Sequence, residues 1–498
     1  MQSNRSKKSL VGIAGLSAIL QVGGGGIATI IRLGCSAVLA RLLDPEDFGI
    51  LGVGIIALEA IAHLGNLGIN AGIISKDKIE EADLSTGFWL LLANRIILFS
   101  FSFAIAPLVA YFFNEPRVCN VFRACSVIFL FSALDAVPRA LITKRLDYLT
   151  LSLIQIGGSI SEGIIAIWLA YSTNLRYWSL IIGMLSTYLL TLIVLYAKTK
   201  WFPKLRWSKI SFKYYLPFMM NGIGGSIVLY LKNNIDYLLV GRILGVRQLG
   251  FYEFAYKVPH AFVRSFVMPL SNILHPLLSK VQNSTETVAS GYFRAMRLIS
   301  IVSFPAMLGL ASVSDILVPV LWGNKWLSII TPLKILCFSG LINCFCAPIE
   351  FLFLAKQRPD LVFRMHMSTF LVTAISVIIL GYFMQLNGVA FGMSIGAVPG
   401  IYFVISGCKL VKASVKALFQ MALRILSLAL CCSLISFAVC TIGTNLGYSD
   451  FLVLIVSIIS AIFAYILLIW LFNREALNEF VILINEVLGK ELINPLGS

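Results

Sequence analysis

The chain of 498 residues carries 39 Lys and Arg against 23 Asp and Glu, which gives a net charge of +16. Hydrophobic residues make up 59% of it and charged residues 12%, and its mean hydropathy is +0.90. A soluble globular domain is about half apolar and about a quarter charged, so this composition excludes that class and predicts an integral membrane protein.

Stretches of about 20 mostly apolar residues, the length that a helix needs to cross a bilayer, recur along the whole chain. In chain order we place fourteen predicted spans at 10–40, 46–70, 86–113, 118–140, 148–171, 176–197, 214–240, 247–272, 290–314, 327–354, 361–383, 386–408, 418–440 and 450–473. Because lipid cannot satisfy backbone polar groups, we expect an all-α integral membrane protein.

Basic residues divide unevenly between the two sets of loops that these spans define. The loops on the side of the N-terminus carry 24 Lys and Arg, and the opposite loops carry 6. Positive charge marks the cytoplasmic side, so both termini of this multi-pass protein are predicted to be cytoplasmic. The net charge is thus a topology signal, and no soluble basic domain is present that would indicate nucleic-acid binding.

An internal repeat relates the two halves of the chain. At an offset of 200, Arg32 aligns with Lys232 and Ser36 with Asp236; after one inserted residue, Gly49 aligns with Gly250. Six spans separate the copies, so both enter the membrane in the same direction, as in a parallel repeat. We expect two six-helix lobes at 1–200 and 210–410, with spans 1, 2, 7 and 8 facing a central cleft. Transmembrane helices 13 and 14 (411–473) and an amphipathic cytoplasmic tail (474–498) lie outside the repeat.

Charged residues inside the spans follow helical spacing. Lys232 and Asp236 share a face of about 60° on the seventh span, and Glu253, Lys257 and Arg264 do so on the eighth. Charges in mid-membrane seldom face lipid, so we expect these side chains to face the protein interior or a wet cavity. Pairing of Lys232 with Asp236 and of Glu253 with Lys257 at i,i+4 is the alternative interpretation.

Motifs of common enzyme classes are missing from the sequence. It contains no HExxH, Walker or GxSxG motif, and its 4 His and 10 Cys show no zinc-ligand spacing. We therefore predict a protein without catalytic residues, metal or cofactor.

Two segments resemble a known family. NIDYLLVGRILGVRQLGFYEFAYKVP (234–259), followed by PLSNILHPLLSKV (269–281), is similar to the seventh and eighth helices of Wzx-type polysaccharide flippases, and LARLLDPEDFGILGVG (39–54) resembles the first lobe of the same proteins. The family belongs to the multidrug/oligosaccharidyl-lipid/polysaccharide exporter superfamily. The similarity is nearest to its colanic-acid and teichuronic-acid exporter branch and extends over about residues 10–490.

The resemblance implies an activity and its partners. Such proteins flip undecaprenyl-diphosphate-linked oligosaccharide units across the cytoplasmic membrane by alternating access, for surface polysaccharide biosynthesis. The expected partners are the lipid-linked oligosaccharide, membrane lipids, and a glycan polymerase or glycosyltransferases. Arg32, Lys232, Lys257, Arg264 and Arg95 are candidates for binding the diphosphate and sugar in the cavity. Asp236, Glu253 and Glu350 are candidates for coupling to an ion gradient.

Two other functions remain open from the residues alone. A cation-drug efflux transporter of the same superfamily would favour unpaired acids in its cavity, whereas here intramembrane acids do not outnumber bases. A non-transporting scaffold for glycan assembly would not need a charged interior, so substitution of the interior charges separates it from a flippase.

Overall fold

The structure is a computed structural model, and it describes residues 23–65, 67–76, 79–221, 224–263, 267–268, 278 and 284–474. These residues are helical almost throughout, and none of them lies in a β-strand. The expected all-α class is therefore confirmed. Residues 475–498 of the tail predicted at 474–498, and the segment around Arg264, lie outside the described residues.

Two compact units divide the chain, Met1–Glu253 and Phe254–Ser498. The boundary lies inside α10, whereas the sequence repeat places the lobes at 1–200 and 210–410; that division stays a prediction. The helices of the first unit are Gly23–Leu42, α2 (Pro45–Leu64), α3 (Ile69–Ser75), α4 (Glu81–Phe113), α5 (Arg117–Lys144), α6 (Tyr148–Ser172), α7 (Tyr177–Thr199), α8 (Lys209–Asn221), α9 (Gly224–Ile243) and the start of α10 (Val246–Phe262).

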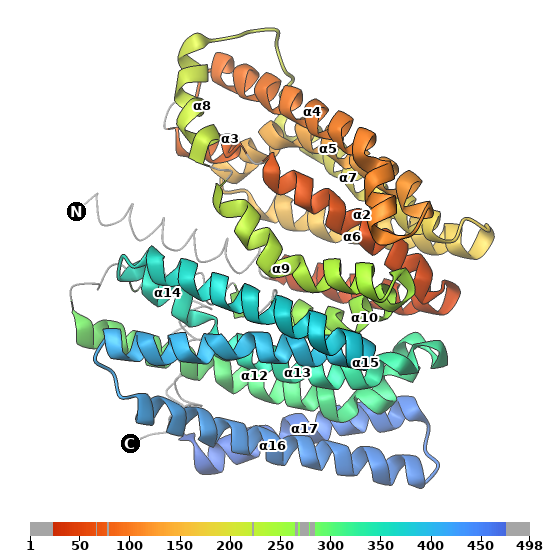
Figure 1. Cartoon of the computed structure of the whole chain (residues 1–498), viewed down its shortest axis with the longest axis vertical. Helices are drawn as coiled ribbons and strands as arrows, with labels where there is room; N and C mark the ends of the chain where they lie inside the picture. Colours follow the sequence, from red (N-terminus) through yellow and green to blue (C-terminus); the bar gives the residue numbers. More distant parts are fainter. Residues whose placement is uncertain are drawn as a thin grey trace. The chain divides into compact units, whose positions relative to one another are not determined.

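Within the first unit, α4 packs along α5, and α6 packs along α7. Short helix α9 lies beside α2 (Figure 1). The helix Gly23–Leu42 lies against α6, because a Cβ on Gly24 would be 2.4 Å from Ser152 Cβ and one on Gly163 would be 2.1 Å from Cys35 Sγ. Small residues at these positions let the two helices approach closely, as is common between membrane helices.

The second unit contains the rest of α10 and a bundle in which α12, α13, α16 and α17 pack side by side (Figure 1). Its elements are α12 (Thr285–Trp322), the 3₁₀ helix η2 (Asn324–Ile329), α13 (Ile330–Cys346), α14 (Pro348–Ala355), α15 (Pro359–Leu410), α16 (Val415–Asn445) and α17 (Asp450–Phe472). Phe304, Phe345 and Tyr292 are among the buried residues of its core.

The 52-residue element α15 is a hairpin of two helices rather than one. Gln385 interrupts it with φ 50° and ψ −131°. Beyond the turn, a Cβ on Gly388 would lie 1.8 Å from the Leu380 carbonyl oxygen, and one on Gly396 would lie 2.0 Å from Thr373 Oγ1. The two arms therefore pack against one another, which agrees with the separate spans predicted at 361–383 and 386–408.

Ten helices among the described residues are long and apolar enough to cross a membrane. The hairpin α15 counts as one of them, while α9 carries Lys232, Asp236 and Arg242 and α10 has 17 residues, so neither qualifies. The predicted number of fourteen spans is therefore not confirmed. Large apolar side chains such as Leu108, Trp168 and Phe463 are exposed on the helices, as expected for surfaces that face lipid.

An ion cluster holds the start of α2 against two neighbouring loops. Arg117 bonds to Glu46 and to Glu115, with Arg117 Nε 2.7 Å from Glu115 Oε1. Arg176 lies 3.2 Å from Asp44 and 3.4 Å from Asp47. The acids of the DPED segment (44–47) are thus paired with two of the few basic residues of the predicted outer loops.

This cluster predicts a pH dependence of stability. The hydrogen bond from Arg117 lowers the pKa of Glu115 from its ordinary value of 4.5. A carboxyl whose pKa is depressed on folding stabilises the protein above its unfolded pKa, and that contribution is lost as the pH falls through the folded pKa. We expect the melting temperature of the purified protein to fall between pH 5 and about pH 3, and to fall less in Arg117→Gln. Lys213→Gln, at an exposed position of α8, is the control; an unchanged dependence of the melting temperature on pH in Arg117→Gln would contradict the assignment.

Candidate functional site

The acid of the seventh predicted span lies buried between two helices. Asp236 on α9 is 1% exposed, and its Oδ2 accepts a hydrogen bond of 2.5 Å from the Tyr252 hydroxyl on α10. Tyr252 is itself fully buried and meets the ring of Tyr237 edge-on at 5.1 Å. Asp236 Oδ1 is buried and has no hydrogen-bond partner among the described residues. A buried carboxylate oxygen without a hydrogen-bond partner is energetically costly.

Contacts with α2 fix which face of α9 is buried. The hydroxyl of Tyr230 donates to the carbonyl oxygen of Ile56 at 2.8 Å. The ring of Tyr230 lies 5.5 Å from that of His63, one helix away. Lys232, two residues further along α9, is half-buried. Helix α9 is thus packed against α2, with Asp236 buried and Lys232 partly covered.

The starts of α2 and α10 meet in a reciprocal contact of two glycines. A Cβ on Gly49 would lie 1.7 Å from the carbonyl oxygen of Val246, and a Cβ on Gly250 would lie 1.8 Å from the carbonyl oxygen of Pro45. Gly49 and Gly250 are equivalent in the sequence repeat, and so are Pro45 and Val246 at the same offset. The backbones touch where no side chain intervenes, and we call these four residues the glycine clasp.

Glu253 lies one turn beyond the clasp on α10. A Cβ on Gly52 of α2 would be 3.2 Å from Glu253 Oε2, so the carboxylate lies against the backbone of α2. Glu253, Asp236 and Lys232 all belong to the first compact unit. The structure therefore places three of the predicted polar residues on two short helices that both pack on α2.

The remaining cationic candidates have different surroundings. Arg32 is exposed on the helix Gly23–Leu42. Arg95 on α4 lies over the ring of Phe129 at 5.8 Å, and its Nε is buried with no hydrogen-bond partner among the described residues. Lys257 lies 4.9 Å from the ring of Phe254, a cation–π contact.

Two candidates of the second half remain. Glu350 on α14 is half-buried, and its Oε1 lies 3.5 Å from Nε2 of His366 on α15. The structure thus gives this acid a titratable neighbour. Arg264 lies outside the described residues.

Several other intramembrane acids have basic partners. Asp135 Oδ2 lies 2.7 Å from Arg139 one turn later on α5. Asp315 on α12 lies 2.7 Å from Lys334 on α13. Neutralised acids of this kind are unsuited to attracting a cationic drug, because their charge is already compensated.

Sequence reasoning missed three of these features. Tyr252 is 16 residues from Asp236, Tyr230 is 174 residues from Ile56, and His366 is 16 residues from Glu350. None of these separations lies within one turn of a single helix, so periodicity carries no signal for them. The alignment of Gly49 with Gly250 was visible in the repeat, but their contact was not.

The fold has counterparts among solved membrane transporters. It is similar to a lipid II flippase MurJ in an inward closed conformation, with a TM-score of 0.75 at 15% identity over 92% of this chain and 100% of that one. It is also similar to an inward-facing multidrug resistance MATE family transporter, with a TM-score of 0.63 at 14% identity over 81% of this chain and 99% of that one. At these identities the likeness defines the fold, that of a multi-span helical transporter.

Sequence comparison defines the family. Residues 38–331 match the polysaccharide biosynthesis protein family. The lipopolysaccharide biosynthesis protein WzxC of Escherichia coli K12 is 30% identical over 381 residues, 74% of this chain and 75% of that protein. The teichuronic acid biosynthesis protein TuaB of Bacillus subtilis 168 is 26% identical over 313 residues, 63% of this chain and 65% of that protein.

The chain therefore belongs to the polysaccharide biosynthesis protein family, and its resemblance to Wzx-type polysaccharide flippases is confirmed. As a member of this family, it is a multi-span polysaccharide-precursor flippase and not an enzyme.

Proposed function

We propose that the protein flips undecaprenyl-diphosphate-linked oligosaccharide units from the inner to the outer leaflet of the bacterial cytoplasmic membrane. The cargo carries two phosphates, so cations must compensate its charge inside the membrane. Arg32, Lys232, Lys257, Arg264 and Arg95 are proposed to supply them. The pairing of Asp135 with Arg139 and of Asp315 with Lys334 favours this anionic cargo over a cationic drug.

The glycine clasp is the observation that supports alternating access. Two repeat-related helices, α2 and α10, meet backbone to backbone through equivalent glycines. A contact made by repeat-equivalent residues has the pseudo-twofold symmetry that a transporter needs to open and close one end of a central path. In the proposed orientation, with both termini in the cytoplasm, the clasp closes the outer end, and outward opening separates the two glycines.

Coupling to an ion gradient is proposed to use Asp236, Glu253 or Glu350. Asp236 has the clearest support, because one buried carboxylate oxygen is bound by Tyr252 and the other has no hydrogen-bond partner among the described residues. Binding of a proton or cation would satisfy that oxygen, and its release would leave it unsatisfied. Such a difference between two states can bias a conformational equilibrium.

The proposal is tested with the full-length protein in proteoliposomes that contain fluorescent undecaprenyl-diphosphate-linked oligosaccharide. The fraction of label reached by a membrane-impermeant quencher is expected to rise from about half to nearly all when the protein is present. Ethidium efflux from the same vesicles tests the cation-drug alternative and is expected to be absent. Efflux of ethidium without flipping of the glycolipid would overturn the proposal. A scaffold would give a different pair of results. The wild-type protein would not flip the glycolipid in vesicles, and cells that carry Lys232→Ala would still make surface polymer.

A further inference from the structure

A pocket of about 380 Å³ lies between α12 and α16, where both helices begin. Its lining is Ala289, Ser290, Phe293, Arg294 and Arg297 of α12, with Ala413, Ser414 and Ala417 at the start of α16. The lining of this pocket, all of it within the described part of the chain, contains two arginines and no acid. A concave site with two guanidinium groups and no carboxylate selects an anion.

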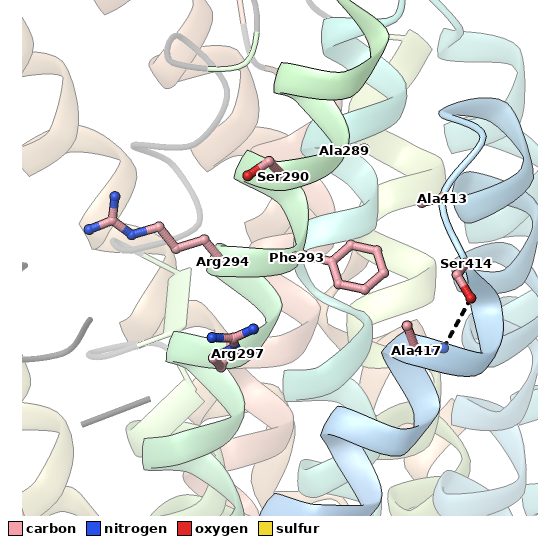
Figure 2. A pocket seen from close by; sticks show the side chains of 8 residues that line it. All are labelled: Ala289, Ser290, Phe293, Arg294, Arg297, Ala413, Ser414 and Ala417. Carbon is pink, nitrogen blue, oxygen red and sulfur yellow. Dashed lines mark hydrogen bonds between the residues drawn. The ribbon is translucent and has the colours of Figure 1, made fainter. Parts of the chain in front are cut away.

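The two surfaces of the pocket differ in character. Figure 2 shows Phe293 pointing from α12 toward Ala417, while Arg294 extends to the other side of the helix. Phe293 and Ala413 pack against the buried core of the second unit, so they form an apolar floor. Arg297 is half-buried beside this floor, whereas Arg294 is exposed and its guanidinium extends away from α16 (Figure 2). A ligand with an apolar part and an anionic head fits this arrangement better than a small inorganic ion.

The first turn of α16 adds to the positive potential. Ser414 caps this 31-residue helix, and its hydroxyl accepts from the amide of Ala417 at 3.2 Å (Figure 2). The N-terminal end of a helix carries a partial positive charge and attracts phosphate. Lys409, Lys412 and Lys416 flank the cap and are exposed. Five basic side chains therefore lie on the segments around one pocket.

Helix length places the pocket at the membrane surface. Helix α12 has 38 residues, which at 1.5 Å per residue is about 57 Å, whereas the hydrocarbon core is about 30 Å thick. At least one end of α12 therefore extends beyond the hydrocarbon, and the charges Glu286, Arg294 and Arg297 in its first turns favour that end for the region of the lipid head groups. Basic pockets between membrane helices at this level are suited to phospholipid head groups.

We propose that the pocket between α12 and α16 binds the phosphate of an anionic phospholipid, with Arg297 and the first turn of α16 on the phosphate, Phe293 against the glycerol and upper acyl chains, and Arg294 adding positive charge from the outer side of α12. The lining of the pocket shares no residue with the set proposed to bind the transported glycolipid, and the inference does not depend on that assignment. Its occupant is a resident membrane lipid that is held at the protein surface.

The test uses the full-length protein in nanodiscs, with lipid retention measured by native mass spectrometry. Phosphatidylglycerol is expected to be retained in preference to phosphatidylcholine of the same acyl chains. Arg294→Gln/Arg297→Gln is expected to lower the affinity for phosphatidylglycerol by about tenfold or more, because each basic residue near an anionic lipid contributes substantially to binding. Ala417→Trp, which fills the pocket and keeps both arginines, should lower it as well.

Arg358→Gln/Arg364→Gln is the matched control, since it removes two exposed arginines from the same unit but away from the pocket lining. It should leave retention within twofold of the wild type. An equal loss in this control would overturn the site in favour of a general charge effect. Displacement of the lipid by millimolar inorganic phosphate would overturn the lipid assignment and identify a site for free phosphate.

Discussion

Replacing Lys232 by alanine should abolish transport of the lipid-linked oligosaccharide while the amount of protein in the membrane stays normal. A hydrogen bond to a charged group contributes about 1.5–3 kcal/mol, so a lost contact to the diphosphate should lower transport by about tenfold to more than a hundredfold. Lys232→Arg should retain part of the activity, because a guanidinium keeps the charge but changes the geometry. The measurement is quencher-accessible glycolipid in proteoliposomes, normalised to protein.

A double substitution separates substrate binding by Lys232 from simple pairing with Asp236. Asp236→Asn is the suitable partner change, because an amide oxygen can still accept from the Tyr252 hydroxyl that bonds to Asp236. If Lys232 served only to neutralise Asp236, removing both charges would relieve the unpaired acid and restore transport. We expect Lys232→Ala/Asp236→Asn to stay inactive while Asp236→Asn alone still flips the glycolipid, both measured in proteoliposomes without an ion gradient, where the proposed coupling role of Asp236 is not needed. Lys213→Ala on exposed α8 should transport like the wild type; recovery in the double variant would remove Lys232 from the substrate site.

Substitution at the glycine clasp should lower transport nearly as much as Lys232→Ala does, because it changes the conformational equilibrium and not substrate binding. Gly49→Val and Gly250→Val place side-chain atoms where the carbonyl oxygens of Val246 and Pro45 lie, within 1.7 and 1.8 Å of the new Cβ. The two helix starts must then move apart, so the closed contact becomes less populated. Because a transport cycle needs both the open and the closed state, we expect transport to fall by about tenfold or more, which corresponds to a shift of about 1.4 kcal/mol.

Accessibility distinguishes an opened clasp from a misfolded protein. Leu249 is fully buried beside the clasp, so a cysteine placed there in a background without the native cysteines should resist a membrane-impermeant maleimide added from outside. Gly49→Val should increase that labelling severalfold. Gly34→Val and Gly309→Val are the matched controls, because a Cβ at either position would meet no heavy atom within 4 Å. Labelling that stays low in Gly49→Val would show that the contact does not gate the outer side.

Composition and local periodicity were enough to predict several features of this protein. A chain this apolar and weakly charged has too little polar surface to face water, which indicates a membrane protein. Helices satisfy their own backbone hydrogen bonds in lipid, so an all-α fold could be predicted. The turn between the two arms of α15 was visible because apolar stretches of spanning length end and restart around Gln385. Lys232 and Asp236 were placed on one helix because a spacing of four residues is a property of the helix itself. Family membership could also be predicted from the sequence, because the motifs that carry the resemblance are short stretches of consecutive residues.

The contacts between side chains of different helices depend on how the helices pack, and no sequence pattern predicted them. Asp236 is bound by Tyr252 of the next helix, and Tyr230 is bound by the backbone of α2, because packing sets the rotation and approach of α9. Gly49 and Gly250 are 201 residues apart in the sequence and meet in the glycine clasp. Their backbones approach so closely that a side chain at either position would collide with the other helix. The pocket at Arg294 and Arg297 exists because α16 begins beside them. Such contacts result from the sum of many weak packing interactions along whole helices, and no single stretch of sequence encodes that sum.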